Sequence, residues 1–183
     1  MEPGQDRKVA ALTFIFYVHF LFLKVMFMID KDEYFMGIAL KEAKKALRRE
    51  EVPVGAIIVN GDKIIARGHN MRELKGDITK HAELIAIKQA NRKLKDWRLN
   101  DCVLYVTLFP CSMCASAILQ SRISRIVIGA PTSDTKNKKI VDLLFEVESD
   151  KPMISITENI LSDECSNLLK EFFKEQRKNI KNK

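Results

Sequence analysis

Two short stretches of the sequence carry the residues that could do chemistry. The first is His81-Ala82-Glu83 and the second is Pro110-Cys111-Ser112-Met113-Cys114, and each opens a pattern typical of a helix. One imidazole and two thiols form a three-ligand set for zinc that leaves the fourth position to water, as in catalytic rather than structural sites. The carboxylate of Glu83 is then free to accept a proton from that water. We therefore predict a zinc centre held by His81, Cys111 and Cys114, with Glu83 as its catalytic proton shuttle.

The spacing within each stretch limits how these side chains can meet. Residues two apart in a regular helix point roughly 200° apart, so His81 and Glu83 can share a target only if His81 lies at the entry turn. Cys111 and Cys114 are three apart and fit one helical face. Zinc lowers the pKa of its bound water to ~7, and Glu83 could pass the released proton to a ring nitrogen and help an amine leave as ammonia. The predicted chemistry is hydrolytic deamination of an amino-substituted aromatic ring.

The elements that must position these residues alternate between helices and strands. The patterns predict, in chain order, a helix from Asp32 to before Pro53, a hairpin of Val54–Asn60 and Lys63–Gly68, a polar loop, a helix over His81–Leu94, a strand Cys102–Thr107, a helix Cys111–Gln120, a strand Arg125–Gly129, a polar loop Pro131–Lys139, a short helix near Val141–Phe145, a strand Ile154–Thr157 and a helix from Ser162 to about Ile180. Strand, helix and strand from Cys102 to Gly129 indicate a right-handed crossover with parallel strands. The predicted fold class is α/β: a three-layer α/β/α sandwich around a mixed five-stranded sheet with an antiparallel hairpin at one end, within a domain of residues 30–183.

Composition is that of a globular chain of ordinary domain size. Its 183 residues carry a formal net charge of +7, which is compatible with a polyanionic partner. Two of its four cysteines have metal-ligand spacing, so the set does not resemble a disulfide framework. Cys102 and Cys165 are interpreted as small buried residues. A reducing, cytoplasmic setting is the prediction.

Residues 1–29 form an apolar N-terminal extension. The run from Val9 to Ile29 is broken only by Thr13, His19 and Lys24, and its length approaches that of a bilayer-spanning helix. Three interpretations compete: a mis-assigned start with Met26 or Met28 as the real first residue, a membrane segment that tethers the domain on the cytoplasmic side, or an added helix. We favour the first, because the following domain is complete without this segment. No stable membrane partner is then expected.

From Asp32 onward the chain resembles the bacterial tRNA-specific adenosine deaminases of the cytidine deaminase-like superfamily. The conjunction of His-Ala-Glu with Pro-Cys-x-x-Cys about thirty residues later is the signature of zinc deaminases. The other matching stretches are Glu51-Val52-Pro53-Val54-Gly55-Ala56, Gly68-His69-Asn70, Leu104-Tyr105-Val106-Thr107-Leu108, Ser121-Arg122-Ile123, Gly129-Ala130, Asp163-Glu164-Cys165 and Phe172-Phe173.

This resemblance implies a homodimer with one zinc ion per subunit that converts the wobble adenosine of an arginine tRNA to inosine. It implies that Asn70 hydrogen-bonds the target base. Phe172-Phe173 and the basic helix after them match the part that lies against the anticodon stem-loop. The predicted substrate-binding residues are Asn70, Phe109 and Phe173.

Three departures from the family pattern accompany this resemblance. Phe109 stands where the family typically has glutamate before Pro-Cys, the segment Pro131–Lys139 lacks the usual Arg-Asp and glycines, and the apolar extension has no counterpart. Phe109 is the feature that favours the first alternative, a free-base or nucleotide deaminase acting on guanine or cytosine. A second alternative, a non-catalytic zinc domain that binds RNA, leaves the free carboxylate of Glu83 without a purpose.

Overall fold

The computed structural model describes residues 26, 28, 30–146 and 154–181. The chain divides into two compact units, Met1–Tyr34 and Phe35–Lys183. The described residues of the first unit, which are Met26, Met28 and residues 30–34, are helical. The rest of the apolar extension lies outside the described residues, so its interpretations stay predictions. Within the described part of the chain, no helix is long and apolar enough to cross a membrane.

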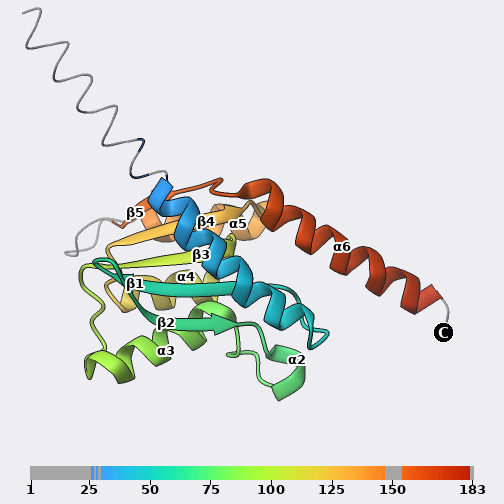
Figure 1. Cartoon of the computed structure of the whole chain (residues 1–183), viewed down its shortest axis with the longest axis horizontal. Helices are drawn as coiled ribbons and strands as arrows, with labels where there is room; N and C mark the ends of the chain where they lie inside the picture. The colour runs from blue at the N-terminus through green and yellow to red at the C-terminus, as the bar shows by residue number, and fades with distance from the viewer. Residues whose placement is uncertain (1–25, 27, 29, 147–153, 182–183) are drawn as a thin grey trace, which may run out of the picture. The chain divides into compact units, whose positions relative to one another are not determined.

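A mixed sheet of five strands is the centre of the second unit (Figure 1). The strands are β1 (Gly55–Asn60), β2 (Lys63–His69), β3 (Cys102–Leu108), β4 (Arg125–Ala130) and β5 (Ser155–Thr157), in the order β2-β1-β3-β4-β5. β1 is antiparallel to both β2 and β3, whereas β3, β4 and β5 are parallel to one another. The mixed sheet, the hairpin at one end and the parallel β3–β4 pair confirm the predicted topology.

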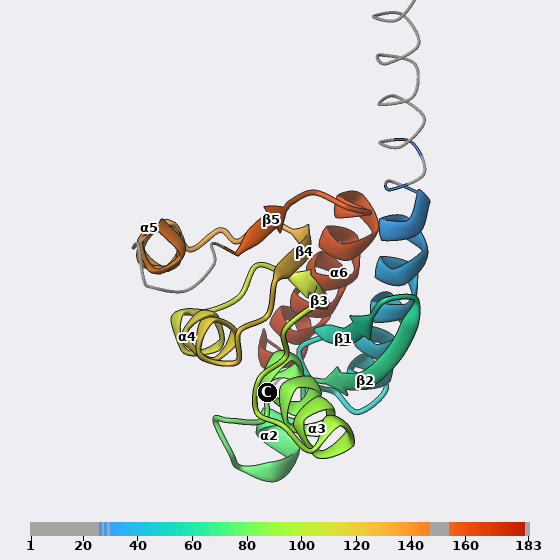
Figure 2. The same cartoon turned by 90° about the vertical axis from the view of Figure 1, so that its left-hand side faces the viewer.

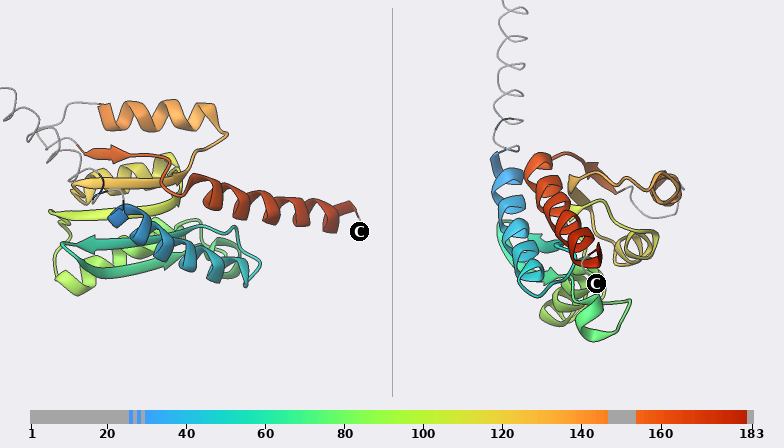
Figure 3. Two further views of the ribbon diagram at one scale, coloured as in Figure 1. Left: turned by 45° about the horizontal axis from the view of Figure 1, so that its top comes forward. Right: turned by 90° about the vertical axis from the view of Figure 1, so that its right-hand side faces the viewer.

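Helices cover both faces of this sheet, as Figure 2 shows. α3 (Ala82–Leu94), α4 (Ser112–Gln120) and α5 (Thr135–Glu146) share one core with Leu104 and Val106 of β3. Residues 35–47, which are helical, and α6 (Ser162–Lys181) lie on the other face, where Tyr105 of β3 packs with Phe35 and Cys165 (Figure 3). Alternation along β3 therefore supplies both cores, as expected for a strand buried on its two faces.

Two strands approach helix backbones so closely that only glycine fits. A Cβ atom on Gly55 would lie 2.1 Å from the carbonyl oxygen of Ala39, and one on Gly68 would lie 2.2 Å from that of Ala82. The residues of α3 that face the sheet are correspondingly small: Ala82, Ala86 and Ala90 are fully buried. This close packing fixes the first turn of α3 against β2.

Three local predictions were wrong in detail. The loop between β2 and α3 contains a short helix, α2 (Arg72–Lys75), which ends at Gly76 in the left-handed conformation. The apolar spacing of the His81–Leu94 helix predicts Leu84, Ile85, Ile87 and Ala90 on its inward face; Ile87 and Ala90 are buried, but Leu84 and Ile85 are only half-buried because the small residues take the inner positions. The segment Pro131–Lys139 is not all loop, since α5 begins at Thr135.

The cysteines follow the prediction. All four are free thiols, and Cys102 and Cys165 are buried.

Candidate active site

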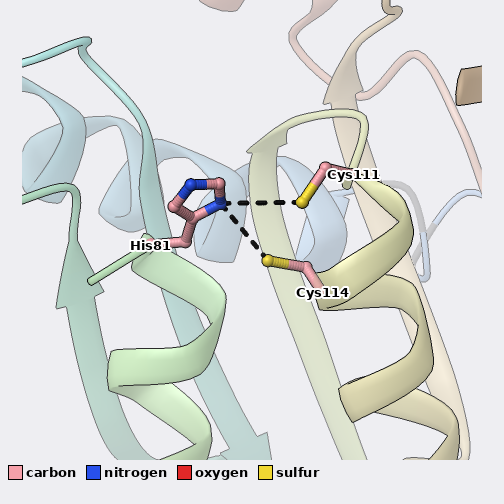
Figure 4. A group of neighbouring side chains, drawn as sticks. All are labelled: His81, Cys111 and Cys114. Atoms are coloured by element: carbon pink, nitrogen blue, oxygen red, sulfur yellow. Dashed lines mark hydrogen bonds between the residues drawn. The ribbon is translucent and has the colours of Figure 1, made fainter. Parts of the chain in front are cut away.

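The predicted zinc ligands lie at the N-termini of α3 and α4. His81 and Cys111 are the N-cap residues, both with extended backbone, at φ −72° and ψ 150° for His81 and φ −77° and ψ 166° for Cys111. Neither side chain makes the capping hydrogen bond that Ser, Thr, Asp or Asn would make at this position. Both instead point toward each other across the gap between the helices (Figure 4). The requirement that His81 lie at an entry turn is confirmed.

The distances among the three side chains suit a tetrahedral zinc ion. His81 Nδ1 lies 3.7 Å from Cys111 Sγ and 3.5 Å from Cys114 Sγ, and the three ligand atoms all lie within 4.8 Å of one another. Zn–S bonds of about 2.3 Å and a Zn–N bond of about 2.0 Å at tetrahedral angles separate sulfur from nitrogen by about 3.5 Å. The donor set and its spacing therefore fit zinc without rearrangement.

The two thiols differ in how readily they ionise. A hydrogen bond from Cys114 and another from His81 lower the pKa of Cys111 to about 4, against the effect of its burial. The same hydrogen bond to Cys111, together with burial, raises the pKa of Cys114. Its hydrogen bond with Cys111 raises the pKa of His81. Cys111 is thus the thiol that ionises more readily, and zinc binding would release the protons that its ligands carry.

Glu83 lies in the first turn of α3 and is 4% exposed. Burial raises the pKa of its carboxyl group. A carboxyl group whose pKa moves toward neutrality is better suited to accept and return a proton during catalysis. The start of α3 therefore brings together a predicted metal ligand, His81, and two residues later the buried carboxyl group of Glu83.

A cavity of about 150 Å³ opens beside the cluster. Two of the predicted zinc ligands, His81 and Cys111, line it together with Glu83. Its walls combine apolar side chains with two polar ones: Val52, Val54, Leu108, Phe109, Asn70 and Arg72. Pockets for drug-sized ligands usually exceed about 300 Å³, so this cavity suits a single small ring between apolar walls. The structure thus brings Asn70 and Phe109 together with Glu83 and two of the predicted zinc ligands, His81 and Cys111.

Sequence reasoning missed the role of Glu51, which organises one wall of this cavity. Its carboxylate is 1% exposed. Oε2 accepts a hydrogen bond of 3.0 Å from Asn70 Nδ2, and Oε1 accepts one of 2.7 Å from the backbone N–H of Leu74 in α2. Because a carboxylate only accepts, the amide NH₂ of Asn70 must face Glu51. In the sequence, the only sign of this role was that Glu51 opens the family-like stretch Glu51-Val52-Pro53-Val54-Gly55-Ala56.

Arg72 was also missed. It is the first residue of α2 and lines the cavity, while its side chain stays about half exposed and pairs with Glu73. A guanidinium at the cavity rim is a suitable partner for a phosphate of a bound nucleotide.

The structure does not bring Phe173 into this cavity. Phe173 is 44% exposed on α6, and Phe172 beside it is buried. Phe172 lines a second cavity together with the carboxylate-bearing residues Glu50, Glu171 and Glu175. A substrate-binding role for Phe173 stays a prediction.

Comparisons with known proteins agree with this site. Residues 29–130 match the family model of the cytidine and deoxycytidylate deaminase zinc-binding region. A tRNA-specific adenosine deaminase of Buchnera aphidicola subsp. Schizaphis graminum is 43% identical over 148 residues, which cover 81% of this chain and 97% of that protein.

Two solved structures extend the comparison. One, from biochemical and structural studies of A-to-I editing by tRNA:A34 deaminases at the wobble position of transfer RNA, matches with a TM-score of 0.68 and 34% identity, and covers 74% of this chain and 99% of that one. A guanine deaminase from Bacillus subtilis matches with a TM-score of 0.54 and 28% identity, and covers 80% of this chain and 93% of that one. The chain belongs to the zinc-binding cytidine and deoxycytidylate deaminase family and, within it, to the tRNA-specific adenosine deaminases.

Proposed function

We propose that this protein is a zinc-dependent hydrolase that converts adenosine to inosine at the wobble position of a tRNA. The observation that carries the proposal is a ring-sized cavity lined by His81, Cys111 and the buried residue Glu83, with Cys114 completing a three-ligand cluster that fits zinc. The tRNA-specific names of the relatives support the choice of substrate.

In the reaction, water adds at C6 of the adenine ring, and inosine and ammonia are the products. Zinc in a site of this kind supplies a water molecule that is acidic enough to react at neutral pH. Glu83 would take a proton from the attacking water, deliver it to the ring nitrogen, and help the amine leave as ammonia. The protein would hold the zinc ligands and Glu83 on one side of the bound base.

The cavity walls orient the base. Phe109 and Val54 offer apolar surface to the faces or edges of a ring, as in other pockets that receive a base removed from its stack. Asn70 has an amide oxygen and one N–H left for the base edge after its bond to Glu51. Together they would hold the reacting carbon next to the zinc cluster.

We infer that the substrate is a polynucleotide, because Arg72 lies at the cavity rim and the chain carries a net charge of +7. Phosphate contacts by arginine and lysine dominate the affinity of proteins for nucleic acids. The exposed residues Phe173, Lys174 and Arg177 of α6 suit contact with an anticodon stem-loop. We propose a homodimer with one zinc ion per subunit, acting on an arginine tRNA in the cytoplasm.

A guanine or cytosine deaminase remains the second candidate. Phe109, which replaces a family glutamate in the cavity wall, favours it, and so does the similarity to a guanine deaminase fold. With an apolar ring in place of a carboxylate, this wall offers different contacts to the bound nucleotide. The base that the cavity accepts can therefore differ from the one that the family accepts.

The test is to incubate the purified protein with its host's arginine tRNA and to sequence the product, because inosine is copied as guanosine. Inosine at the wobble position in the wild type, and none with Glu83→Gln, is the expected result. Ammonia released from guanine or cytosine, with no inosine in the tRNA, would instead establish the second candidate. Less than one equivalent of zinc and no activity on any base would contradict both.

A further inference from the structure

The segment Pro131–Lys139, which departs from the family pattern, becomes the start of α5 in this chain. Asp134 Oδ1 accepts hydrogen bonds from the backbone N–H groups of Lys136 at 3.1 Å and Asn137 at 3.0 Å, which caps the helix. Helix formation at this point presents Asn137 and Lys138 to the loop that carries the first cysteine ligand.

The amide of Asn137 bonds to the peptide groups on both sides of Cys111. Its Oδ1 accepts the backbone N–H of Ser112 at 3.0 Å, and its Nδ2 donates to the carbonyl oxygen of Pro110 at 3.1 Å. Ser112 is the first residue of α4, so its N–H has no partner within the helix. One side chain therefore fixes the orientation of the peptide before the ligand and of the peptide after it.

The next residue supports the wall of the cavity. Lys138 Nζ lies 4.6 Å from the centroid of the Phe109 ring, and it is held there by Asp142 at 3.1 Å and Glu158 at 3.6 Å. Phe109 is 5% exposed and lines the cavity. Two departures from the family pattern, Phe109 and the 131–139 segment, are thus in direct contact and form one structural unit.

We propose that Asn137 is a positioning residue of the zinc site, which holds Cys111 in the orientation that the metal requires. Residues that orient metal ligands typically change metal affinity by about 10–100-fold when they are replaced. This inference rests on the zinc site of the proposed function and not on the choice of substrate.

The experiment measures zinc affinity of the full chain by competition with a chelator of known affinity. Asn137→Ala removes both hydrogen bonds, and alanine favours the helical conformation, so α5 is expected to stay intact. Asn137→Asp keeps the acceptor for Ser112 but loses the donor to Pro110, which gives a second route to the same effect. Lys139→Ala, at an exposed position of the same helix, is the matched control.

We expect zinc binding to weaken about 10–100-fold in Asn137→Ala, to weaken in Asn137→Asp, and to stay at the wild-type value in Lys139→Ala. With cobalt in place of zinc, the thiolate-to-metal absorption of Asn137→Ala should differ from that of the wild type. Wild-type zinc affinity in both Asn137 variants, or an equal loss in Lys139→Ala, would overturn the proposal and leave the proposed function standing. A wild-type protein that binds no zinc would overturn the proposed function itself.

Discussion

The two helix N-termini that meet at the zinc cluster are held in place by different means. The start of α3 is fixed by main-chain close packing, because Gly68 of β2 lies directly against the carbonyl oxygen of Ala82. The start of α4 is fixed by a side chain from a distant helix, because Asn137 bonds to the peptides around Cys111. Both helices begin with a residue that serves the metal instead of capping the helix.

This difference shows where the site tolerates change. Close packing against a glycine is part of the core, so a substitution there affects the whole domain. A hydrogen bond from α5 can be removed with little effect on the core, so a substitution there affects the site alone. Substitutions on the two sides should therefore differ in what they change: the whole domain on the α3 side and the site alone on the α4 side.

On the α3 side, Glu83→Gln removes the acid–base group and keeps its shape. We expect deamination to fall by about 10²–10⁴-fold or more, because general acid–base catalysis typically contributes that much. Zinc content should remain at the wild-type level, since Glu83 is not among the three ligands. Single-turnover rates on tRNA and metal analysis of the same sample check both parts; an active variant would refute the role.

The packing of α3 is tested by Gly68→Ala. The added Cβ would meet backbone atoms at 2.2 Å, so the strand and helix must move apart, and we expect a loss of about 3 kcal/mol in the free energy of unfolding. Gly37→Ala is the matched control, because nothing lies within 4 Å of a Cβ there. It should stabilise the helix by about 0.5–1 kcal/mol. Urea unfolding of both variants measures the contrast, and equal stabilities would contradict the close-packing argument.

Hydrogen bonding at the cavity wall is tested by Glu51→Gln. A glutamine side chain would direct its NH₂ group at one of the two donors, Asn70 Nδ2 or the N–H of Leu74, and that hydrogen bond would be lost. A buried donor left without a partner costs about 1–3 kcal/mol of stability. We expect the KM for tRNA to rise, by about tenfold for each 1.4 kcal/mol by which the binding free energy of the substrate is weakened. Glu42→Gln is the control: it is equally buried but pairs with Lys45 away from the cavity. In Glu42→Gln the free energy of unfolding should fall, while the KM for tRNA stays at the wild-type value.

The smallest effect is expected from Lys138→Met, on the α4 side. The substitution removes the ammonium group from the face of the Phe109 ring. We expect this to lower the free energy of unfolding by about 0.5–1 kcal/mol. Zinc affinity should not change, because Asn137 and its two hydrogen bonds remain. Lys136→Met, at an exposed position two residues earlier, is the control. A loss of zinc affinity in Lys138→Met would show that the ring contact, and not Asn137, holds the ligand loop.

Much of the fold followed from local patterns. The hairpin around Asn60-Gly61, the strand of Cys102–Leu108 and the long α6 each depend on residues close together in sequence, and each formed as expected. Two details differ from the prediction: Leu84 and Ile85 of α3 are only half-buried, and α5 begins earlier, at Thr135. The first depends on how near β2 comes, and the second on the capping bond that Asp134 makes.

The amino-acid sequence alone was enough to predict the ligand set, a carboxylate of Glu83 outside that set, and the requirement that His81 lie at a helix entry. These follow from side-chain chemistry and from spacings of two or three residues, which helix geometry converts directly into directions. Only the tertiary structure decided which residues support them. Glu51 reaches Asn70 across 19 positions, and Asn137 reaches Ser112 across 25. Such pairings depend on how the strands and helices pack, and no local pattern in the chain records them.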